Sequence, residues 1–103
     1  MQNPNATPTF TDFGLDSRLL KAAYKLGYES PTPVQQQAIP PILEGRDCLV
    51  SAETGSGKTA AYLLPILQKM LVSPSKTSGI KALILCPTRE LAQQIFGQCQ
   101  LFC

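Results

Sequence analysis

The chain has 103 residues, of which nine are basic and seven acidic, and its net charge is +2. This length fits one small domain or part of a larger one and excludes a multidomain enzyme within the chain. The hydrophobic fraction of 44% and the charged fraction of 16% are close to globular averages, which argues against disorder over the whole length. The net charge is too small to indicate nucleic acid or an anionic membrane by itself.

The chain contains no histidine, which excludes imidazole bases, histidine metal ligands and serine–histidine–aspartate triads. Its longest apolar run, residues 60–67, includes a proline, whereas a membrane span needs about 20 apolar residues. The polar start does not resemble a signal peptide. We therefore expect an intracellular protein without membrane partners, in the nucleus, the nucleolus or the cytoplasm.

The four cysteines form no Cys-x-x-Cys pair, so their spacing argues against a zinc site. Cys48 and Cys86 are interpreted as small buried hydrophobic residues, with a disulfide role as the less favoured alternative.

Residues 1–9 are interpreted as a flexible lead, and a first helix is predicted after them. Asp16 is a suitable N-cap, and apolar residues then recur at helical spacing up to Leu26. Gly27 follows at the position that accepts a left-handed backbone, so the helix is expected to end there.

A second helix is predicted after the proline-rich stretch 30–33. Thr32 can cap this helix, and Pro33 can occupy its first position, where a missing N–H group costs nothing. The prolines at positions 40 and 41 are expected to disturb it.

Two aliphatic runs, residues 48–51 and 80–86, are predicted to be buried strands. A helix is predicted from Lys58, with Pro65 kinking or restarting it, and another from Arg89 onward. This last helix has one apolar stripe, formed by Leu91, Ala92, Ile95, Phe96, Cys99 and Phe102. The order of strand, helix, strand and helix is typical of an α/β protein with a parallel sheet and flanking helices.

The segment Ala52-Glu-Thr-Gly-Ser-Gly-Lys-Thr59 follows the first predicted strand and leads into a helix, the context expected of a Walker A phosphate loop. Gly55 and Gly57 let backbone N–H groups turn toward phosphate oxygens. Lys58 would neutralise the β- and γ-phosphates, and the Thr59 hydroxyl would hold Mg²⁺. The alternative is a glycine-rich turn with a solvent-exposed lysine. The residues predicted to bind the nucleotide here are Ala52, Glu53, Thr54, Gly55, Ser56, Gly57, Lys58 and Thr59, of which Lys58 and Thr59 are the catalytic candidates.

Three motifs together resemble the start of the first RecA-like domain of a DEAD-box ATP-dependent RNA helicase. They are the Q motif at 27–35 with the upstream Phe10, the phosphate loop, and motif Ia at 87–92. The resemblance implies a partial RecA-like P-loop domain over residues 10–103, truncated after motif Ia. Within it, a Q-motif region spans 10–39 and an ATP-binding region spans 46–103. The activity it implies is RNA unwinding or remodelling, coupled to the binding and hydrolysis of ATP with Mg²⁺.

The resemblance assigns base recognition to Gln35. An amide side chain can donate and accept at once, as the N6 amino group and N7 of adenine require. The resemblance also places the Tyr28 ring on the base, with Phe10 bracing the segment from behind. Ordinary core packing is the alternative for both aromatic residues, and an ordinary polar helix residue is the alternative for Gln35.

Motif Ia begins a helix just past the end of a predicted strand, where α/β sheets place ligands. The helicase resemblance implies that Pro87, Thr88 and Arg89 contact RNA phosphates there without reading the base sequence, whereas the spacing alone does not decide for RNA. The alternative is that Thr88 only caps the helix and that Arg89 pairs with Glu90.

No Asp-Glu pair follows the phosphate loop, because all three aspartates precede it and Glu90 is the only later acidic residue. Phosphoryl transfer needs such carboxylates to hold Mg²⁺ and position the attacking water. We therefore expect the N-terminal nucleotide-binding fragment of a helicase, inactive on its own. The alternative is a short non-catalytic product that binds nucleotide or a protein partner without turnover.

Overall fold

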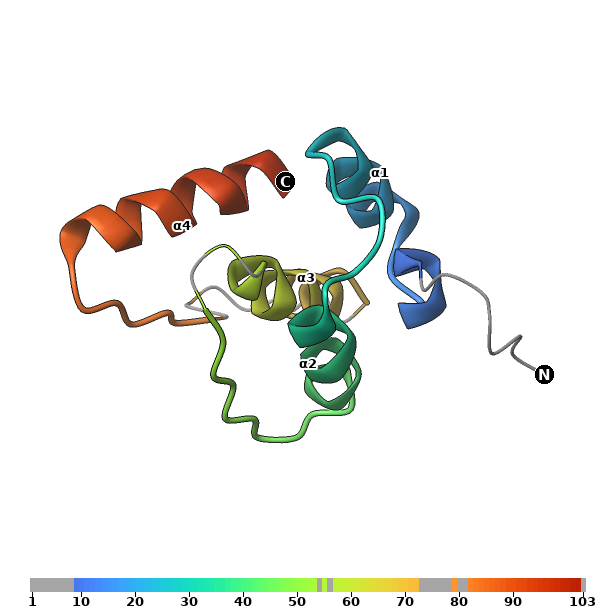
Figure 1. The fold of residues 1–103 in the computed structure, drawn as a ribbon, viewed down its shortest axis with the longest axis horizontal. Coiled ribbons are helices and arrows are strands. Elements are labelled where there is room, and N and C mark those ends of the chain that lie inside the picture. Colours follow the sequence, from blue (N-terminus) through green and yellow to red (C-terminus); the bar gives the residue numbers. More distant parts are fainter. Residues whose placement is uncertain (1–8, 54, 56, 73–78, 80–81, 103) are drawn as a thin grey trace.

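The computed structural model describes residues 9–53, 55, 57–72, 79 and 82–102 (Figure 1). These residues form a 3-10 turn, η1 (Phe10–Phe13), and the helices α1 (Ser17–Lys25), α2 (Pro33–Leu43), α3 (Lys58–Val72) and α4 (Arg89–Phe102). No strand occurs in this part of the chain. The predicted lead up to residue 8 and the first two residues of the predicted strand 80–86 lie outside the described residues. None of the described helices is long and apolar enough to cross a bilayer.

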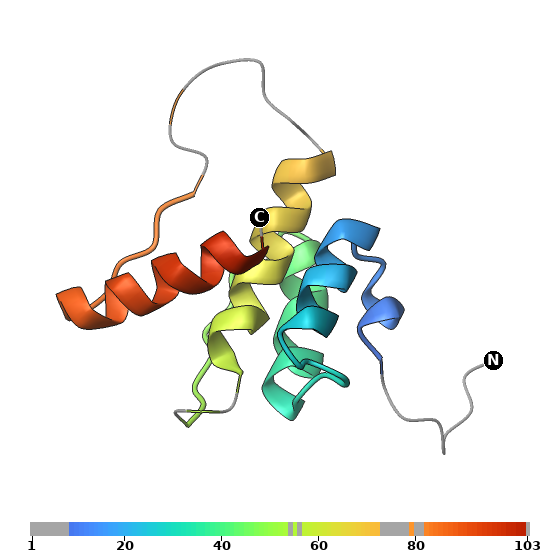
Figure 2. The ribbon, with the colours of Figure 1, turned by 90° about the horizontal axis from the view of Figure 1, so that it is seen from above.

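Helices α2 and α3 pack along each other at the centre of the molecule, and α1 lies beside them (Figures 1 and 2). The core joins the turn η1, these three helices and the last turn of α4. Its buried members are Phe10, Leu15, Leu19, Ala23, Ile39, Ala60, Leu63, Leu64 and Phe102. The helices that precede and follow the phosphate loop are therefore held in one packed unit.

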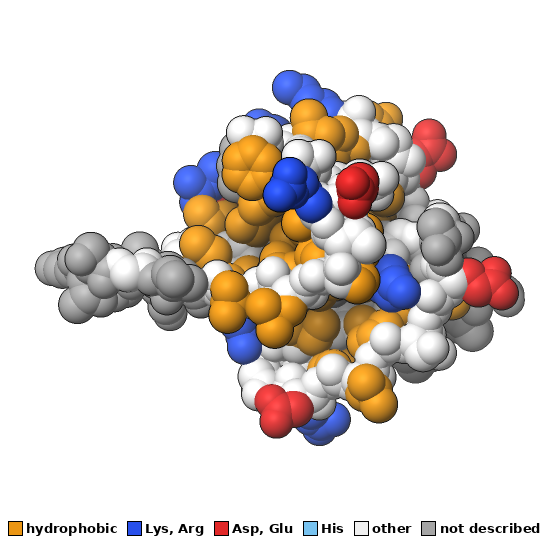
Figure 3. All heavy atoms as spheres, turned by 90° about the vertical axis from the view of Figure 1, so that its left-hand side faces the viewer, with side chains coloured by type: hydrophobic (Ala, Val, Ile, Leu, Met, Phe, Trp, Pro, Cys, Tyr) orange, Lys and Arg blue, Asp and Glu red, His pale blue; other side chains and the backbone are white. Residues whose placement is uncertain are grey.

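Helix α4 joins this core only near its C-terminal end. Its first turns extend away from the other helices in both ribbon views (Figures 1 and 2). Of the predicted apolar stripe, Ile95 and Phe102 are buried and Cys99 is half-buried, whereas Leu91 and Phe96 are exposed. Figure 3 shows hydrophobic side chains spread over the face on that side of the molecule. The described residues thus leave the stripe uncovered at Leu91 and Phe96.

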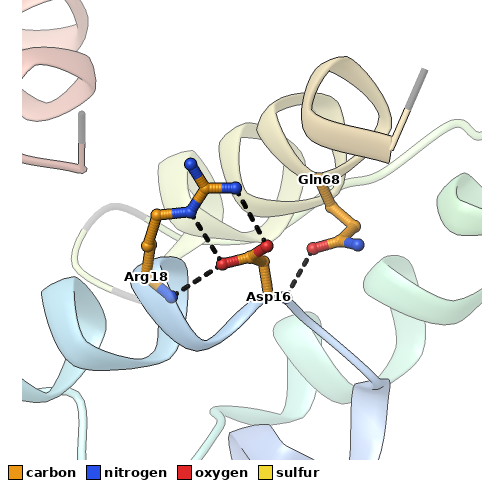
Figure 4. A network of polar contacts seen from close by, with 3 residues as sticks. All are labelled: Asp16, Arg18 and Gln68. Carbon is orange, nitrogen blue, oxygen red and sulfur yellow. Dashed lines mark hydrogen bonds and ion pairs between the residues drawn. The ribbon is translucent and has the colours of Figure 1, made fainter. Parts of the chain in front are cut away.

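The start of α1 agrees with the prediction, because the Asp16 carboxylate accepts the N–H of Arg18 at 2.9 Å. The Arg18 guanidinium also donates to this carboxylate, at 3.0 and 3.1 Å. Hydrogen bonds from the Arg18 side chain and backbone lower the pKa of Asp16 to about 2. The Asp16 N–H donates to Oε1 of Gln68 at 2.6 Å, which ties the start of α1 to α3 (Figure 4). Gly27 follows the helix with a φ of +90°, as predicted.

Helix α2 begins as predicted, with Thr32 as its cap and Pro33 in its first turn. The expected disturbance at Pro40 and Pro41 was wrong, because the helix continues through both to Leu43. Each proline removes a hydrogen-bond donor from a carbonyl one turn earlier, but those carbonyls belong to the exposed residues 36 and 37, where water can donate instead. Helix α3 likewise runs through its internal proline without restarting.

The two predicted strands, and with them the predicted parallel sheet, are not formed in the described residues. Residues 48–51 and 82–86 are unpaired, and their aliphatic side chains are exposed: Leu83 is 74% and Leu85 is 85% exposed. A strand needs a neighbour that bonds its backbone N–H and C=O groups, and neither segment has one here. Cys48, predicted to be buried, is exposed for the same reason, and Cys86 is half-buried.

We expect the chain to self-associate through residues 82–86, because exposed aliphatic side chains beside unpaired backbone groups promote edge-to-edge pairing. Replacing Leu83 and Leu85 together by lysine should raise the concentration needed for association by at least about tenfold, since two leucines lose their burial. Sedimentation velocity over a concentration series measures this, with helix content checked by circular dichroism. Val72→Lys, at an exposed position on α3, is the matched control. A monomeric unmodified chain at high concentration would contradict the expectation.

Candidate nucleotide-binding site

The predicted phosphate loop leads directly into the N-terminus of α3. Gly55 and Gly57 have φ values of +86° and +83°, in the left-handed region that favours glycine. The Gly57 carbonyl accepts the N–H of Ala61 at 3.2 Å, so the loop passes into the helix without a break. The unpaired N–H groups of a helix start and the helix dipole both favour an anion there. Thr54 and Ser56 lie outside the described residues.

The Lys58 side chain connects the end of the phosphate loop to its beginning. Its Nζ donates to the carbonyl oxygen of Ala52 at 2.9 Å. Ala52 is half-buried, whereas Glu53 and Lys58 are exposed. No ion pair involves Lys58 in the part of the chain that the structure describes. Its ammonium group is therefore held over the loop by a neutral partner, which a phosphate can displace.

Thr59 lies half-buried in the first turn of α3, next to a residue that the sequence reasoning missed. Its side chain hydrogen-bonds Tyr62, one turn further along the helix. Burial raises the pKa of Tyr62, and the hydrogen bond with Thr59 opposes this rise. The spacing of three residues on a helix is the signal that could have identified the pair.

Gln35 is fully buried and links α2 to the phosphate loop. Its Oε1 accepts the N–H of Thr32 at 2.9 Å, and its Nε2 donates to the Gly57 carbonyl at 3.0 Å. Both halves of the amide are thus engaged within the protein. The capping-box pattern Thr-x-x-Gln at 32–35 could have shown the first of these bonds. The second joins residues 22 positions apart, and no local pattern signals it.

Gly57 and Gln35 approach so closely that no side chain fits between them. A Cβ atom added at Gly57 would overlap Nε2 of Gln35, and it would lie 3.2 Å from its Cδ and 3.4 Å from Cγ2 of Thr32. At Gly55, a Cβ would meet no described atom within 4 Å. Glycine is therefore required at position 57 for both its backbone conformation and its contact.

The aromatic residues of the Q-motif region pack on one another. Tyr28 stacks on Phe102, with ring centroids 6.3 Å apart and an interplanar angle of 22°, and it meets Phe10 edge-on at 6.3 Å. No hydrogen bond or ring contact joins Tyr28 to Gln35 or to the phosphate loop among the described residues. The structure therefore brings Gln35, but not Tyr28, into contact with the loop.

The motif Ia residues Pro87, Thr88 and Arg89 are exposed at the start of α4. The Thr88 hydroxyl accepts the N–H of Leu91 at 3.1 Å, so Thr88 does cap the helix. The described residues show no ion pair between Arg89 and Glu90, and no hydrogen bond from residues 87–89 to the phosphate loop. These side chains remain accessible to a ligand.

A cavity of about 700 Å³ lies between α2 and the segment that enters the phosphate loop. Its walls are Pro33, Val34, Gln37, Ala38, Pro41 and residues 48–53. Gln35 does not line it. The cavity thus borders the segment that leads into the predicted phosphate loop.

The sequence of this chain is similar to those of known proteins. The sequence model of the DEAD/DEAH box helicase family matches residues 32–103. The chain is 48% identical over 100 residues to the probable ATP-dependent RNA helicase ddx56 of Dictyostelium discoideum, covering 92% of the chain and 15% of that protein. It is 57% identical over 89 residues to the probable ATP-dependent RNA helicase DDX49 of Mus musculus, covering 86% and 18%. The chain therefore spans less than a fifth of the length of these relatives.

Two solved structures are similar in fold to this chain. The RNA helicase Prp28 from Chaetomium thermophilum, bound to ADP, superposes with a TM-score of 0.84 at 48% identity, over 97% of this chain and 25% of that one. A DEAD box protein from Methanococcus jannaschii gives a TM-score of 0.79 at 36% identity, over 91% and 25%. Both neighbours are RecA-like helicase domains. Because the family's sequence model matches more than half of this chain, the chain belongs to the DEAD/DEAH box helicase family.

Proposed function

We propose that this chain forms the nucleotide-binding part of an ATP-dependent RNA helicase, which unwinds or remodels RNA while it binds and hydrolyses ATP. The observation that carries the proposal is the loop of residues 52–59, which leads into α3 and is held by Gln35. The curated relatives are named ATP-dependent RNA helicases, and the chain covers 15% to 18% of those compared above. The complete activity therefore belongs to a longer protein.

The described residues fit an adenine nucleotide with Mg²⁺. Gly55 and Gly57 have the left-handed backbone conformations that let loop N–H groups turn toward an anion. Lys58 would exchange the Ala52 carbonyl for phosphate oxygens, and Thr59 would supply a hydroxyl to Mg²⁺. When bound, the nucleotide supplies the phosphoryl group that is transferred to water. Loop and helix N–H groups hold the negative charge in place.

Gln35 would recognise the base through the N–H group and the oxygen lone pair of its amide that its bonds to Thr32 and Gly57 do not use. A side-chain amide has two N–H groups and two lone pairs on its oxygen, and one of each is used here. Because the residue is fully buried, base recognition requires the first turn of α2 to move relative to the phosphate loop. Binding of the base and the position of the loop are thereby coupled through one side chain.

The remaining roles concern RNA and the sheet. Pro87, Thr88 and Arg89 would contact RNA phosphates at the exposed start of α4, in a manner independent of base sequence. Tyr28 would contact the base after a rearrangement of the aromatic cluster. Residues 48–51 and 80–86 would become strands of a parallel sheet once further strands pair with them. The exposure of their aliphatic side chains supports this proposal.

The test of this function separates binding from turnover. The purified chain should bind ATP but release no phosphate above background, with or without RNA, because no Asp-Glu pair follows Lys58. Lys58→Ala should remove the binding. A colorimetric phosphate assay and equilibrium dialysis with labelled ATP measure the two quantities. Turnover that disappears in Lys58→Ala would show that another carboxylate, such as Glu53 or Glu90, performs the missing role.

A further inference from the structure

Two segments of this chain belong to no helix and carry exposed aliphatic side chains. Residues 48–51 connect α2 to the phosphate loop, and residues 82–86 lead into α4 (Figure 1). Their exposed large hydrophobic residues are Leu49, Val50, Leu83, Ile84 and Leu85. Neither segment pairs with a neighbouring strand among the described residues. Each therefore has both an apolar surface and a row of backbone groups available for pairing.

Exposure alternates along both segments. Leu49 is 102% exposed, and the next residue, Val50, is 36% exposed. Leu83 and Leu85 are 74% and 85% exposed, whereas Ile84 between them is 37% exposed. An alternation with a period of two is the pattern of a strand whose two faces have different surroundings. Both segments therefore have the side-chain pattern of strands without having formed a sheet.

The segment 48–51 forms part of the wall of the cavity of about 700 Å³ beside α2. Val34 and Ala38 of α2 line this cavity together with Leu49 and Val50. Among the described residues that line it, Glu53 is the only charged one. An aliphatic strand that paired with this segment would place side chains against α2, and their removal from water would be favourable.

We propose that residues 82–86 of a second copy of this chain pair with residues 48–51 and fill the cavity with their aliphatic side chains. Neither segment contains a charged residue, so no like charges within the contact oppose the pairing. The contact joins two different surfaces, and every copy carries one of each. Such a contact produces an open-ended assembly unless it closes into a ring.

Pairing of residues 82–86 with the same segment of another copy is less favourable. A two-stranded ribbon by itself is marginally stable at best, and packing against a helix is one way to stabilise it. Residues 48–51 share the cavity with α2, and residues 82–86 are not part of its lining. The pairing of unlike segments therefore covers one face of the new strand, whereas the pairing of like segments does not.

The pairing uses residues that precede the predicted phosphate loop at 52–59. In a longer helicase chain, further strands of the sheet would compete with the second copy for the same segments. The assembly is therefore measured on the chain of 103 residues, without nucleotide. Failure of the assembly and failure of nucleotide binding are seen in separate measurements.

The experiment mixes two variants, each of which lacks one half of the contact. Leu83→Lys/Leu85→Lys disables the inserted segment, and Leu49→Lys/Val50→Lys disables the segment that receives it. Each variant alone should remain monomeric. Their equimolar mixture should form a dimer and grow no further, with an association constant at least about tenfold above that of either variant alone, since two leucines regain their burial.

Sedimentation velocity over a concentration series measures the association, with a reductant present because Cys48 is exposed. Both double variants gain the same positive charge, so repulsion opposes the mixed pair as much as the like pairs. Val72→Lys, at an exposed position on α3, adds a charge outside the contact. This control should associate within about twofold of the unmodified chain.

Several results would overturn the proposal. If Leu49→Lys/Val50→Lys associates as strongly as the unmodified chain, the segment 82–86 pairs with itself. A mixture that associates no more strongly than the separate variants excludes the contact between unlike segments. A monomeric unmodified chain also excludes it, and a strand signal in its circular dichroism would then identify pairing within one chain. Should a double variant unfold, Leu49→Lys and Leu85→Lys, at the most exposed position of each segment, take the place of the pair.

Discussion

Gly57→Ala is expected to destabilise the chain by about 3 kcal/mol and to remove nucleotide binding. An alanine held at a φ of +83° costs about 1–2 kcal/mol. Its Cβ would overlap Nε2 of Gln35, and a buried amide that loses its partner costs about 1–3 kcal/mol more. Urea unfolding followed by circular dichroism measures the total, and titration with a fluorescent ADP measures binding.

Gly55→Ala provides the matched control. Its φ of +86° imposes the same backbone cost, but a Cβ there meets no described atom within 4 Å. The difference between the two variants therefore isolates the contact with Gln35. In a double-mutant cycle, Gln35→Ala should reduce the cost of Gly57→Ala, because it removes the side chain that the new Cβ would strike. Equal losses at the two glycines would contradict the contact.

Gln35→Glu is expected to lower the free energy of unfolding at neutral pH by about 2–4 kcal/mol, since it buries an unpaired charge. One carboxylate oxygen could still accept the Thr32 N–H. The other would face the Gly57 carbonyl, which also only accepts. Thermal unfolding of this variant beside Gln37→Glu, at an exposed position of the same helix, separates burial from charge. The control should stay within about 0.5 kcal/mol of the unmodified chain.

The pH dependence of Gln35→Glu gives the prediction a second readout. Burial and the facing carbonyl both favour the neutral carboxyl group and so raise its pKa in the folded chain. The variant should therefore recover stability as the pH falls through this raised pKa, because the protonated group can again donate to the Gly57 carbonyl. A destabilisation that does not change with pH would show that the introduced group is not confined next to this carbonyl.

The sequence predicted where α1 and α2 begin, because N-capping depends on neighbouring residues. Asp16 caps α1 through an N–H two residues away, and Thr32 caps α2 within the same turn. The predicted strands were not found in the described residues, because strand pairing depends on residues far away in the sequence. Residues 82–86 have the composition of a buried strand, but pairing requires a partner that the sequence pattern of one segment does not specify. Their side chains are exposed as a result.

The candidate site also combines features that the local sequence predicts with contacts that it does not. The glycine conformations of the phosphate loop follow from its local sequence, and the structure has them at positions 55 and 57. The bond from Gln35 to Gly57 joins α2 to that loop, and the bond from Asp16 to Gln68 spans 52 positions. Such contacts arise only when helices pack in three dimensions. The stacking of Tyr28 on Phe102 of α4 could not be predicted from the local sequence for the same reason.

The claim that residues 52–59 hold an adenine nucleotide, with Gln35 reading the base, is tested most directly by competitive titration of ATP and GTP into the unmodified chain. ATP should bind at least about tenfold more tightly than GTP, since one bidentate amide–base contact contributes about 1–3 kcal/mol of discrimination. Lys58→Ala should remove the binding of both nucleotides. Equal affinity for ATP and GTP, or ATP binding that survives Lys58→Ala, would contradict the claim.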